Sequence, residues 1–71
     1  MNTEQYLECL GKRIKALRKQ KGLSQQALAS RMETKHPQIV KIERGKTNVT
    51  IGMLGKIAVE LDISIKELVI V

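Results

Sequence analysis

Aromatic residues are nearly absent from this 71-residue sequence, because Tyr6 stands alone and there is neither Trp nor Phe. Proteins that bind single-stranded nucleic acid, or that read RNA on a β-sheet, stack the bases on aromatic side chains. The composition therefore argues against both classes. Hydrophobic residues still make up 42% of the chain, which is enough for the core of one small domain spanning residues 1–71.

Cysteine and histidine occur once each, as Cys9 and His36. A single cysteine forms no intrachain disulfide and supplies no zinc-ligand set, which is typical of a reducing compartment. We interpret Cys9 as a small apolar residue of the first helix; a reactive thiol is the alternative, although no activating base neighbours it. Without clustered carboxylates or a glycine-rich phosphate loop, we expect no enzymatic activity, no metal and no other cofactor.

Long hydrophobic runs are missing as well. The N-terminal segment MNTEQYLECLGKRIK alternates polar and apolar residues and lacks the continuous apolar region of a secretory signal. No segment approaches the roughly 20 apolar residues that a membrane-spanning helix needs. We therefore expect a cytoplasmic protein that does not enter a membrane.

Positive charge is in excess. Thirteen Lys and Arg residues stand against seven Asp and Glu residues, which gives a formal net charge of +6. A polyanion such as nucleic acid is the first partner to expect for so basic a chain. The alternative is a charged surface that only keeps the protein in solution.

Apolar residues recur at spacings of three and four, which predicts an all-α fold. In the first helix, the apolar stripe consists of Leu7, Leu10, Ile14 and Leu17. Thr3 is the expected N-cap of this helix and Gly22 its expected end. Because Gly11 costs about 1 kcal/mol inside a helix, we expect the regular part to begin only near Leu10.

Two short helices follow. Ser24 is the expected N-cap of the second, QQALASRM, and Thr34 or Lys35 precedes the third, which we expect to run from His36 to Arg44. Pro37 is compatible with the first turn of the third helix, because amides in a first turn have no intrahelical partner.

A fourth helix is expected after the third. Gly45 should end the third helix in a left-handed conformation, and Thr50 should cap the fourth. The expected buried stripe of the fourth helix consists of Ile51, Leu54, Ile57, Ala58 and Leu61. Gly52 and Gly55 weaken its intrinsic stability, and we expect them to mark the close approach of a neighbouring backbone.

A short fifth helix is expected to begin at the capping box SIKE, from Ser64 to Glu67, and to contain Ile65 and Leu68. The chain then ends on LVIV. Val69 to Val71 either fold back onto the core or take part in a contact with a second copy.

Arg18 and Glu43 both fall on the apolar side of their helices. Arg18 follows Ile14 by four residues, and Glu43 follows Ile39 by four residues. A buried guanidinium requires a carboxylate partner. We therefore predict that Arg18 and Glu43 pair and fix the angle of the third helix; the alternative is two independently solvated charges.

The run RIKALRKQKGLSQQALASRM, followed by HPQIVKIERGK and TIGMLGKIAVELDISIKEL, resembles the Xre/Cro-type helix-turn-helix family, which includes lambdoid phage repressors and restriction-modification controller proteins. The resemblance covers about residues 10–68, and its most specific parts are GLSQ at 22–25 and KIERGK at 41–46.

This resemblance implies a compact, five-helix, all-α domain that binds operator DNA as a dimer through its third helix. It also implies that Gln25 contacts a phosphate and that Arg18 and Glu43 form an internal ion pair. The sequence departs from the family pattern at Glu33, where many relatives have Gly. We therefore expect a turn that is wider, or shifted by one residue.

The first turn and outward face of the third helix are expected to meet base edges in the major groove. The predicted base-contacting residues are Lys35, His36, Pro37, Gln38 and Lys41. Lys41 can donate to guanine, Gln38 can pair with adenine or reach a phosphate, and Pro37 offers apolar contact only. A lone histidine such as His36 is alternatively an ordinary solvated residue.

Phosphates are expected at both ends of the two-helix unit. The predicted phosphate-contacting residues are Ser24, Gln25, Arg44, Lys46, Thr47 and Asn48. Gln25 begins a helix whose dipole favours an anion. About five neutralised phosphates for each subunit would give a log–log salt slope of about −4 to −5. A further set of lysines adds diffuse attraction or forms a solvated face, namely Lys12, Lys15, Lys19 and Lys21.

One recognition helix reads too few base pairs for useful specificity. We therefore expect a homodimer on a palindromic operator with half-sites about 34 Å apart, joined through exposed parts of the fourth and fifth helices and LVIV. The sequence thus predicts a double-stranded-DNA-binding transcription regulator. A protein-interaction module, such as an antitoxin or adaptor, is the alternative; Gln25 together with the basic segment 41–46 favours DNA.

Overall fold

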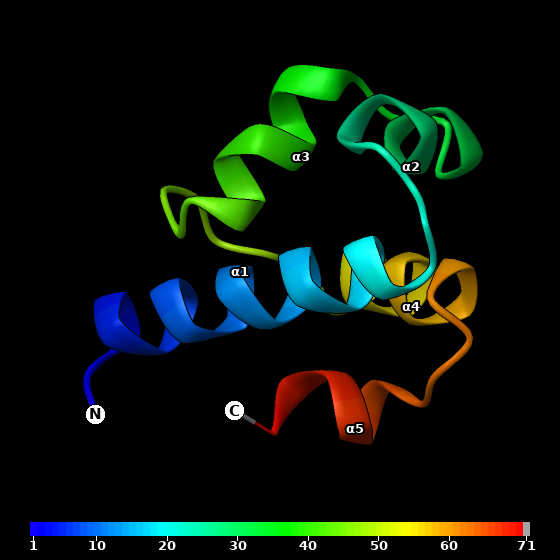
Figure 1. Ribbon diagram of the computed structural model, residues 1–71. Coiled ribbons are helices and arrows are strands. Elements are labelled where there is room, and N and C mark those ends of the chain that lie inside the picture. The colour runs from blue at the N-terminus through cyan, green and yellow to red at the C-terminus, as the bar shows by residue number, and fades with distance from the viewer. Residues whose placement is uncertain (71) are drawn as a thin grey trace.

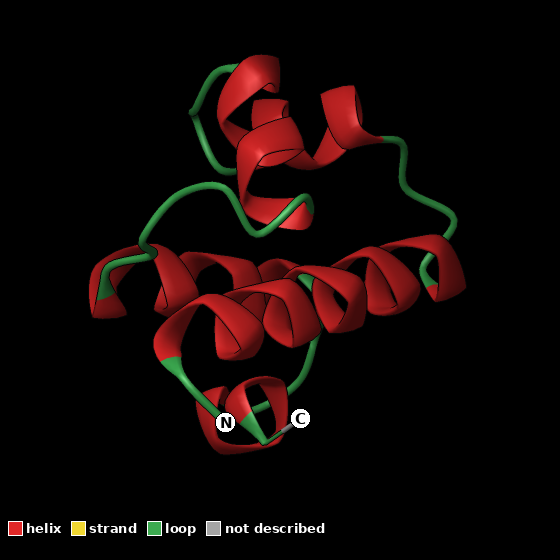
Figure 2. Cartoon of the chain, turned by 90° about the vertical axis from the view of Figure 1, so that its left-hand side faces the viewer, coloured by secondary structure: helices red, strands yellow, loops and turns green. Residues whose placement is uncertain are grey.

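Five helices and no strand make up residues 1–70, the part of the chain that the computed structural model describes. The helices are α1 (Thr3–Gln20), α2 (Gln25–Arg31), α3 (His36–Glu43), α4 (Ile51–Glu60) and α5 (Ile65–Val69). Helices α1 and α4 form a middle layer, with α2 and α3 on one side of it and α5 on the other (Figures 1 and 2). The expected all-α fold is confirmed.

The core is one cluster of 12 buried apolar side chains, to which every helix contributes. Five of them have no exposed surface, one from each helix in turn: Ile14, Leu28, Ile39, Ile57 and Leu68. Burying such a side chain is worth about 1.5–3 kcal/mol. The expected stripe of α4 is wrong at Ile51, which is 73% exposed because it is the first residue of the helix and lies beyond the edge of the core.

Helix α1 begins earlier than expected. Its N-cap is Asn2 rather than Thr3, because the Asn2 side chain accepts from the Gln5 amide (2.8 Å) while the Gln5 side chain accepts from the Asn2 amide (3.0 Å). This capping box stabilises the first turn. The helix then runs without a break through Gly11, so the expectation of regular helix only from Leu10 is wrong.

Gly11 is explained by packing. An added Cβ would lie 2.5 Å from the Glu43 carbonyl oxygen and 2.6 Å from that of Ile42. The missing side chain therefore lets the end of α3 rest directly on α1. Gly52 and Gly55 have no such role, because the nearest atoms to an added Cβ belong to side chains at 3.9 Å and 3.7 Å; the backbone approach expected there is absent.

Four helices end on a residue in the left-handed region: Gly22, Glu33, Gly45 and Asp62, with φ of 72°, 56°, 70° and 57°. Gly45 thus ends α3 as expected. Glu33 takes the conformation that a glycine would take, and the Thr34 amide donates to the Ala29 carbonyl at 2.9 Å, as in an ordinary helix end. The expected wider or shifted turn is therefore not found.

The C-terminal segment packs in part against the rest of the chain. Ser64 caps α5 by accepting from the Glu67 amide at 3.1 Å, whereas the return bond of the expected capping box is replaced by a contact between the two side chains. Val69 packs on the core, and its carbonyl accepts from the Tyr6 hydroxyl at 2.6 Å. Ile70 is 62% exposed. Val71, the last residue of LVIV, lies outside the described residues.

Candidate nucleic-acid interface

The outward side of α3 is not covered by any other part of residues 1–70. Lys35, His36, Pro37 and Lys41 are exposed and Gln38 is half-buried, whereas Ile39 and Ile42 point into the core. Helix α3 lies at the outer edge of the molecule (Figure 1). The structure therefore leaves four of the five predicted base-contacting residues exposed at the start and outer side of α3, with Lys35 as the N-cap, and Gln38 half-buried beside them.

Two glycines and one ion pair hold α3 on α1. Gly11 receives the last carbonyls of α3, as described above. An added Cβ at Gly45, just after α3, would lie 2.8 Å from the Glu8 Cα. Farther along α1, toward its C-terminal end, lies the ion pair of Arg18 and Glu43. The orientation of α3 is therefore set by direct backbone contact and by a buried pair of charges.

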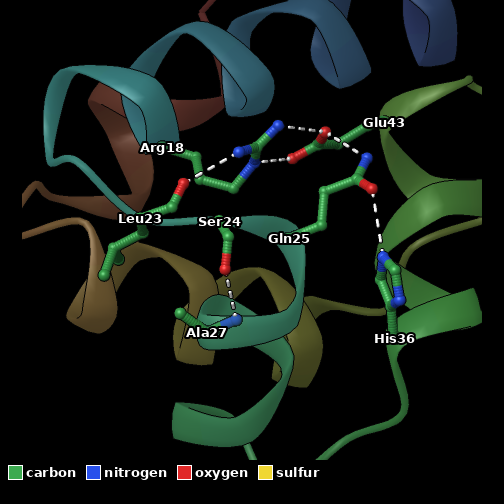
Figure 3. A network of polar contacts seen from close by, with 7 residues as sticks. All are labelled: Arg18, Leu23, Ser24, Gln25, Ala27, His36 and Glu43. Carbon is green, nitrogen blue, oxygen red and sulfur yellow. Dashed lines mark hydrogen bonds and ion pairs between the residues drawn. The ribbon is translucent and has the colours of Figure 1, made fainter.

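Arg18 and Glu43 form the expected ion pair (Figure 3). The Arg18 Nε donates to Glu43 Oε2 at 2.6 Å, and Nη2 donates to Oε1 at 2.9 Å. The Arg18 Nη1 donates to the Leu23 carbonyl at 2.8 Å. The two side chains are only 7% and 2% exposed. The pair is thus buried and hydrogen-bonded, and the alternative of two solvated charges is excluded.

Gln25 extends this network to the surface. Its Nε2 donates to Glu43 Oε1 at 2.9 Å, and its Oε1 lies 3.1 Å from His36 Nε2 (Figure 3). Sequence reasoning missed both contacts, because no spacing rule relates residues that lie 18 and 11 positions apart on different helices. Since an amide nitrogen carries two hydrogens, Gln25 keeps one for an outside acceptor.

The predicted phosphate-contacting residues lie in two groups. Ser24 and Gln25 begin α2, where the Ser24 Oγ accepts from the Ala27 amide at 3.0 Å and keeps its own proton free to donate. The second group follows α3, where Arg44, Lys46 and Asn48 are exposed and Thr47 is half-buried.

A polar cleft of about 540 Å³ lies beside this second group. Lys46, Thr47 and Asn48 line it from one side, and Glu4 and Glu8 of α1 line it from the other. Sequence reasoning missed the two carboxylates, which come close to the loop only because Gly45 allows the chain to rest on α1.

An apolar groove of about 620 Å³ runs between the end of α2 and helices α4 and α5. Its apolar lining includes Met32, Val59, Ile63 and Ile65, and Val59 is 75% exposed. Charges of both signs surround it, namely Arg31, Glu33, Lys56 and Glu60. An exposed apolar surface of this kind is typical of a protein contact.

The described residues 1–70 offer neither a metal site nor a membrane span. No group of three or more His, Cys, Asp or Glu side chains there is placed to hold a metal ion. No helix there is long and apolar enough to cross a membrane. Cys9 is a free, half-buried thiol on α1.

Two short helices joined by a tight turn, the second with a free polar face, define a helix-turn-helix protein. A family model described as helix-turn-helix, HTH_3, matches residues 14–68, and the chain belongs to this Xre-like family.

Solved structures of two regulators resemble this chain. One is the restriction-modification controller protein C.AhdI from Aeromonas hydrophila, which is 39% identical with a TM-score of 0.84, over 87% of this chain and 94% of that one. The other is SinR, the master regulator for biofilm formation, solved in complex with DNA. It is 38% identical with a TM-score of 0.78, over 83% of this chain and 95% of that one.

A curated relative is longer than this chain. The HTH-type transcriptional regulator RC0668 from Rickettsia conorii is 42% identical over 53 residues, which are 75% of this chain. The match spans only 42% of the relative's own length.

Proposed function

We propose that this protein is a cytoplasmic transcription regulator that binds double-stranded DNA in a sequence-specific way, with α3 in the major groove. The observation that carries this proposal is that α3 is held firmly on α1 while its outer face stays exposed. A helix that reads bases must be both accessible and rigidly held. The solved complex of SinR with DNA supports the same use of the fold.

Base edges meet the exposed start and face of α3 in this proposal. The residues assigned to them are Lys35, His36, Pro37, Gln38 and Lys41. Phosphates are assigned to Ser24, Gln25, Arg44, Lys46, Thr47 and Asn48. The net charge of +6 supports the assignment, because phosphate contacts supply much of the affinity for DNA.

The protein acts as a homodimer in this proposal, since two half-sites give the specificity that one cannot. The apolar groove along Val59 and Ile65 suits an isologous contact, in which the same surface serves both copies. Its rim carries Lys56 and Glu60 on the same helix, so that two copies related by a twofold axis can pair opposite charges.

A protein-interaction module without enzymatic activity is the second candidate function. The same apolar groove favours it, because the groove also fits a different protein. The exposed face of α3 does not support this candidate, because a protein bound in the groove would have no use for it.

Selection of bound duplexes from a random pool at low salt separates the two functions. We expect one palindromic sequence to be enriched. Lys41→Ala should weaken binding to it by roughly 5- to 150-fold, which corresponds to about 1–3 kcal/mol for a base contact. Lys66→Ala is the matched control, because Lys66 is an exposed lysine on α5, across the middle layer from α3. No enrichment by the wild-type protein would favour the interaction module.

A further inference from the structure

The hydrogen bonds that link Glu43, Gln25 and His36 have only one consistent direction (Figure 3). Glu43 Oε1 already accepts from the Arg18 guanidinium at 2.9 Å, and an ionised carboxylate can only accept. The Gln25 atom 2.9 Å from this oxygen must therefore be the NH2 group. This leaves the Gln25 oxygen facing His36.

The direction of these bonds selects one form of the His36 imidazole. An amide oxygen only accepts, so the His36 Nε2, 3.1 Å away, must carry a hydrogen. In a neutral imidazole the other nitrogen is then an acceptor, because only one of the two carries a proton. Nδ1 of His36 therefore carries a lone pair, on an exposed side chain that is the first residue of α3.

We infer that His36 is a specificity-determining residue that reads DNA through Nδ1 as a hydrogen-bond acceptor, and that Gln25 is the positioning residue that holds it in this form. The inference rests on the proposed function. In the major groove, the bases that donate are adenine, through N6, and cytosine, through N4. Guanine and thymine offer acceptors at O6 and O4, which would face the lone pair of Nδ1.

The preference at the base that faces His36 should therefore be adenine or cytosine over guanine or thymine. One hydrogen bond is worth about 0.5–1.5 kcal/mol net, so the preference should be about 2- to 10-fold at pH 8, where imidazole groups are ordinarily neutral.

The form of the imidazole can be measured without DNA. His36 is the only histidine, so a long-range proton–nitrogen correlation spectrum of the 15N-labelled protein shows one imidazole. We expect the form with a hydrogen on Nε2 and none on Nδ1 to predominate at pH 8. In Gln25→Ala, folded by circular dichroism, the spectrum should move toward the mixture of forms seen in an unfolded peptide of residues 33–41. A protonated Nδ1, or a spectrum unchanged by Gln25→Ala, overturns the inference.

Base reading is tested by repeating the duplex selection at pH 8 with two variants. His36→Ala removes the imidazole and adds no hydrogen-bonding group, so the preference should disappear at one position of each half-site. His36→Asn places an amide near Nδ1 that can turn to donate or accept, so guanine should be accepted there as well.

The outcomes distinguish this inference from the proposed function. A preference that persists in His36→Ala overturns the inference and leaves DNA binding intact. No selected duplex for the wild-type protein overturns both the proposed function and base reading by His36, whereas the nitrogen spectrum still reports separately on the bond to Gln25.

Discussion

Arg18 of α1 and Glu43 of α3 lie 25 residues apart in the sequence, and two hydrogen bonds of 2.6 Å and 2.9 Å join their side chains inside the protein. Taking two charges out of water is costly, and their attraction offsets this cost only in a good geometry with further hydrogen bonds. Leu23 and Gln25 supply those further bonds. The pair therefore serves chiefly to fix how α3 is presented.

Removal of one partner should be far more harmful than removal of both. Arg18→Met leaves the Glu43 carboxylate buried without its cation, and we expect the free energy of unfolding to fall by about 3–5 kcal/mol in urea denaturation. The double variant Arg18→Met, Glu43→Met should lie within about 1–2 kcal/mol of the wild type, or above it.

The exposed pair of Lys21 and Asp62 provides the control. Their atoms are 3.5 Å apart and the side chains are 44% and 87% exposed, so Lys21→Met should change stability by less than about 1 kcal/mol. If Arg18→Met also lowered the free energy of unfolding by less than about 1 kcal/mol, the buried pair would contribute no more to stability than the exposed pair.

Substitution by alanine should change the stability of the protein in opposite directions at Gly11 and at Gly52. At Gly11 the new methyl group would meet two backbone carbonyl oxygens at about 2.5 Å, and we expect Gly11→Ala to destabilise the protein by about 1–3 kcal/mol or more. At Gly52 the nearest atom is a side-chain oxygen at 3.9 Å, so Gly52→Ala should stabilise it by about 0.5–1 kcal/mol. Thermal unfolding of both variants checks this contrast; a shift of the same sign in both would contradict it.

Replacement of Glu33 by glycine should stabilise the protein. Its φ of 56° is left-handed, which costs a residue with a side chain about 1–2 kcal/mol and costs glycine little. Because glycine also gains freedom in the unfolded chain, we expect Glu33→Gly to raise the free energy of unfolding by about 0.5–1 kcal/mol. Glu33→Ala keeps the Cβ and should change stability little; an equal gain in Glu33→Ala would rule out backbone strain as the cause.

Helical phase predicted the parts of the site that depend on one helix at a time. Arg18 and Glu43 each follow a buried isoleucine by four residues, and this was sufficient to place both in the core. The same reasoning placed Lys41 on the free face of α3. It failed at Ile51, because phase alone does not show where a core ends along a helix.

Other features depend on partners that are distant in the sequence. Propensity wrongly placed the start of the regular first helix near Gly11, and only the position of the Ile42 and Glu43 carbonyls shows why the residue is there. The contact of Gln25 with His36 likewise depends on how α2 and α3 cross. The sequence predicts Thr3 as the cap of the first helix, but asparagine caps a helix at least as well as threonine, and only the geometry of the first turn shows that Asn2 is the cap.

The loop after α3 should control the dependence of DNA binding on salt. If Lys46 neutralises one phosphate, Lys46→Ala should reduce the log–log slope of affinity against salt by about 0.9, and reduce it equally for all sequences. Fluorescence anisotropy with labelled duplex between about 50 and 200 mM salt measures this slope. Lys66→Ala on α5 should leave it unchanged. An unchanged slope in Lys46→Ala would remove this lysine from the phosphate contacts.

The apolar groove should control self-association. Val59 lines the groove and is 75% exposed, so a charge there does not disturb the core of one copy. If two copies meet at this surface, Val59→Glu buries an unpaired carboxylate at the contact. We expect the dimer dissociation constant to rise by roughly 30-fold or more, the equivalent of about 2 kcal/mol for a central interface residue.

Ile51→Glu is the matched control, because Ile51 lies on the same helix, is 73% exposed and is not part of the groove lining. Sedimentation equilibrium of the wild type and both variants measures the association, and circular dichroism shows that each is folded. Val59→Glu should also bind a single half-site about as well as the wild type, because each copy keeps its α3 face. It should lose the added affinity that the wild type has for an operator with two half-sites. If Val59→Glu and Ile51→Glu weakened the dimer equally, the contact would lie elsewhere on the molecule. If the wild-type protein stayed monomeric on a full operator, there would be no dimer.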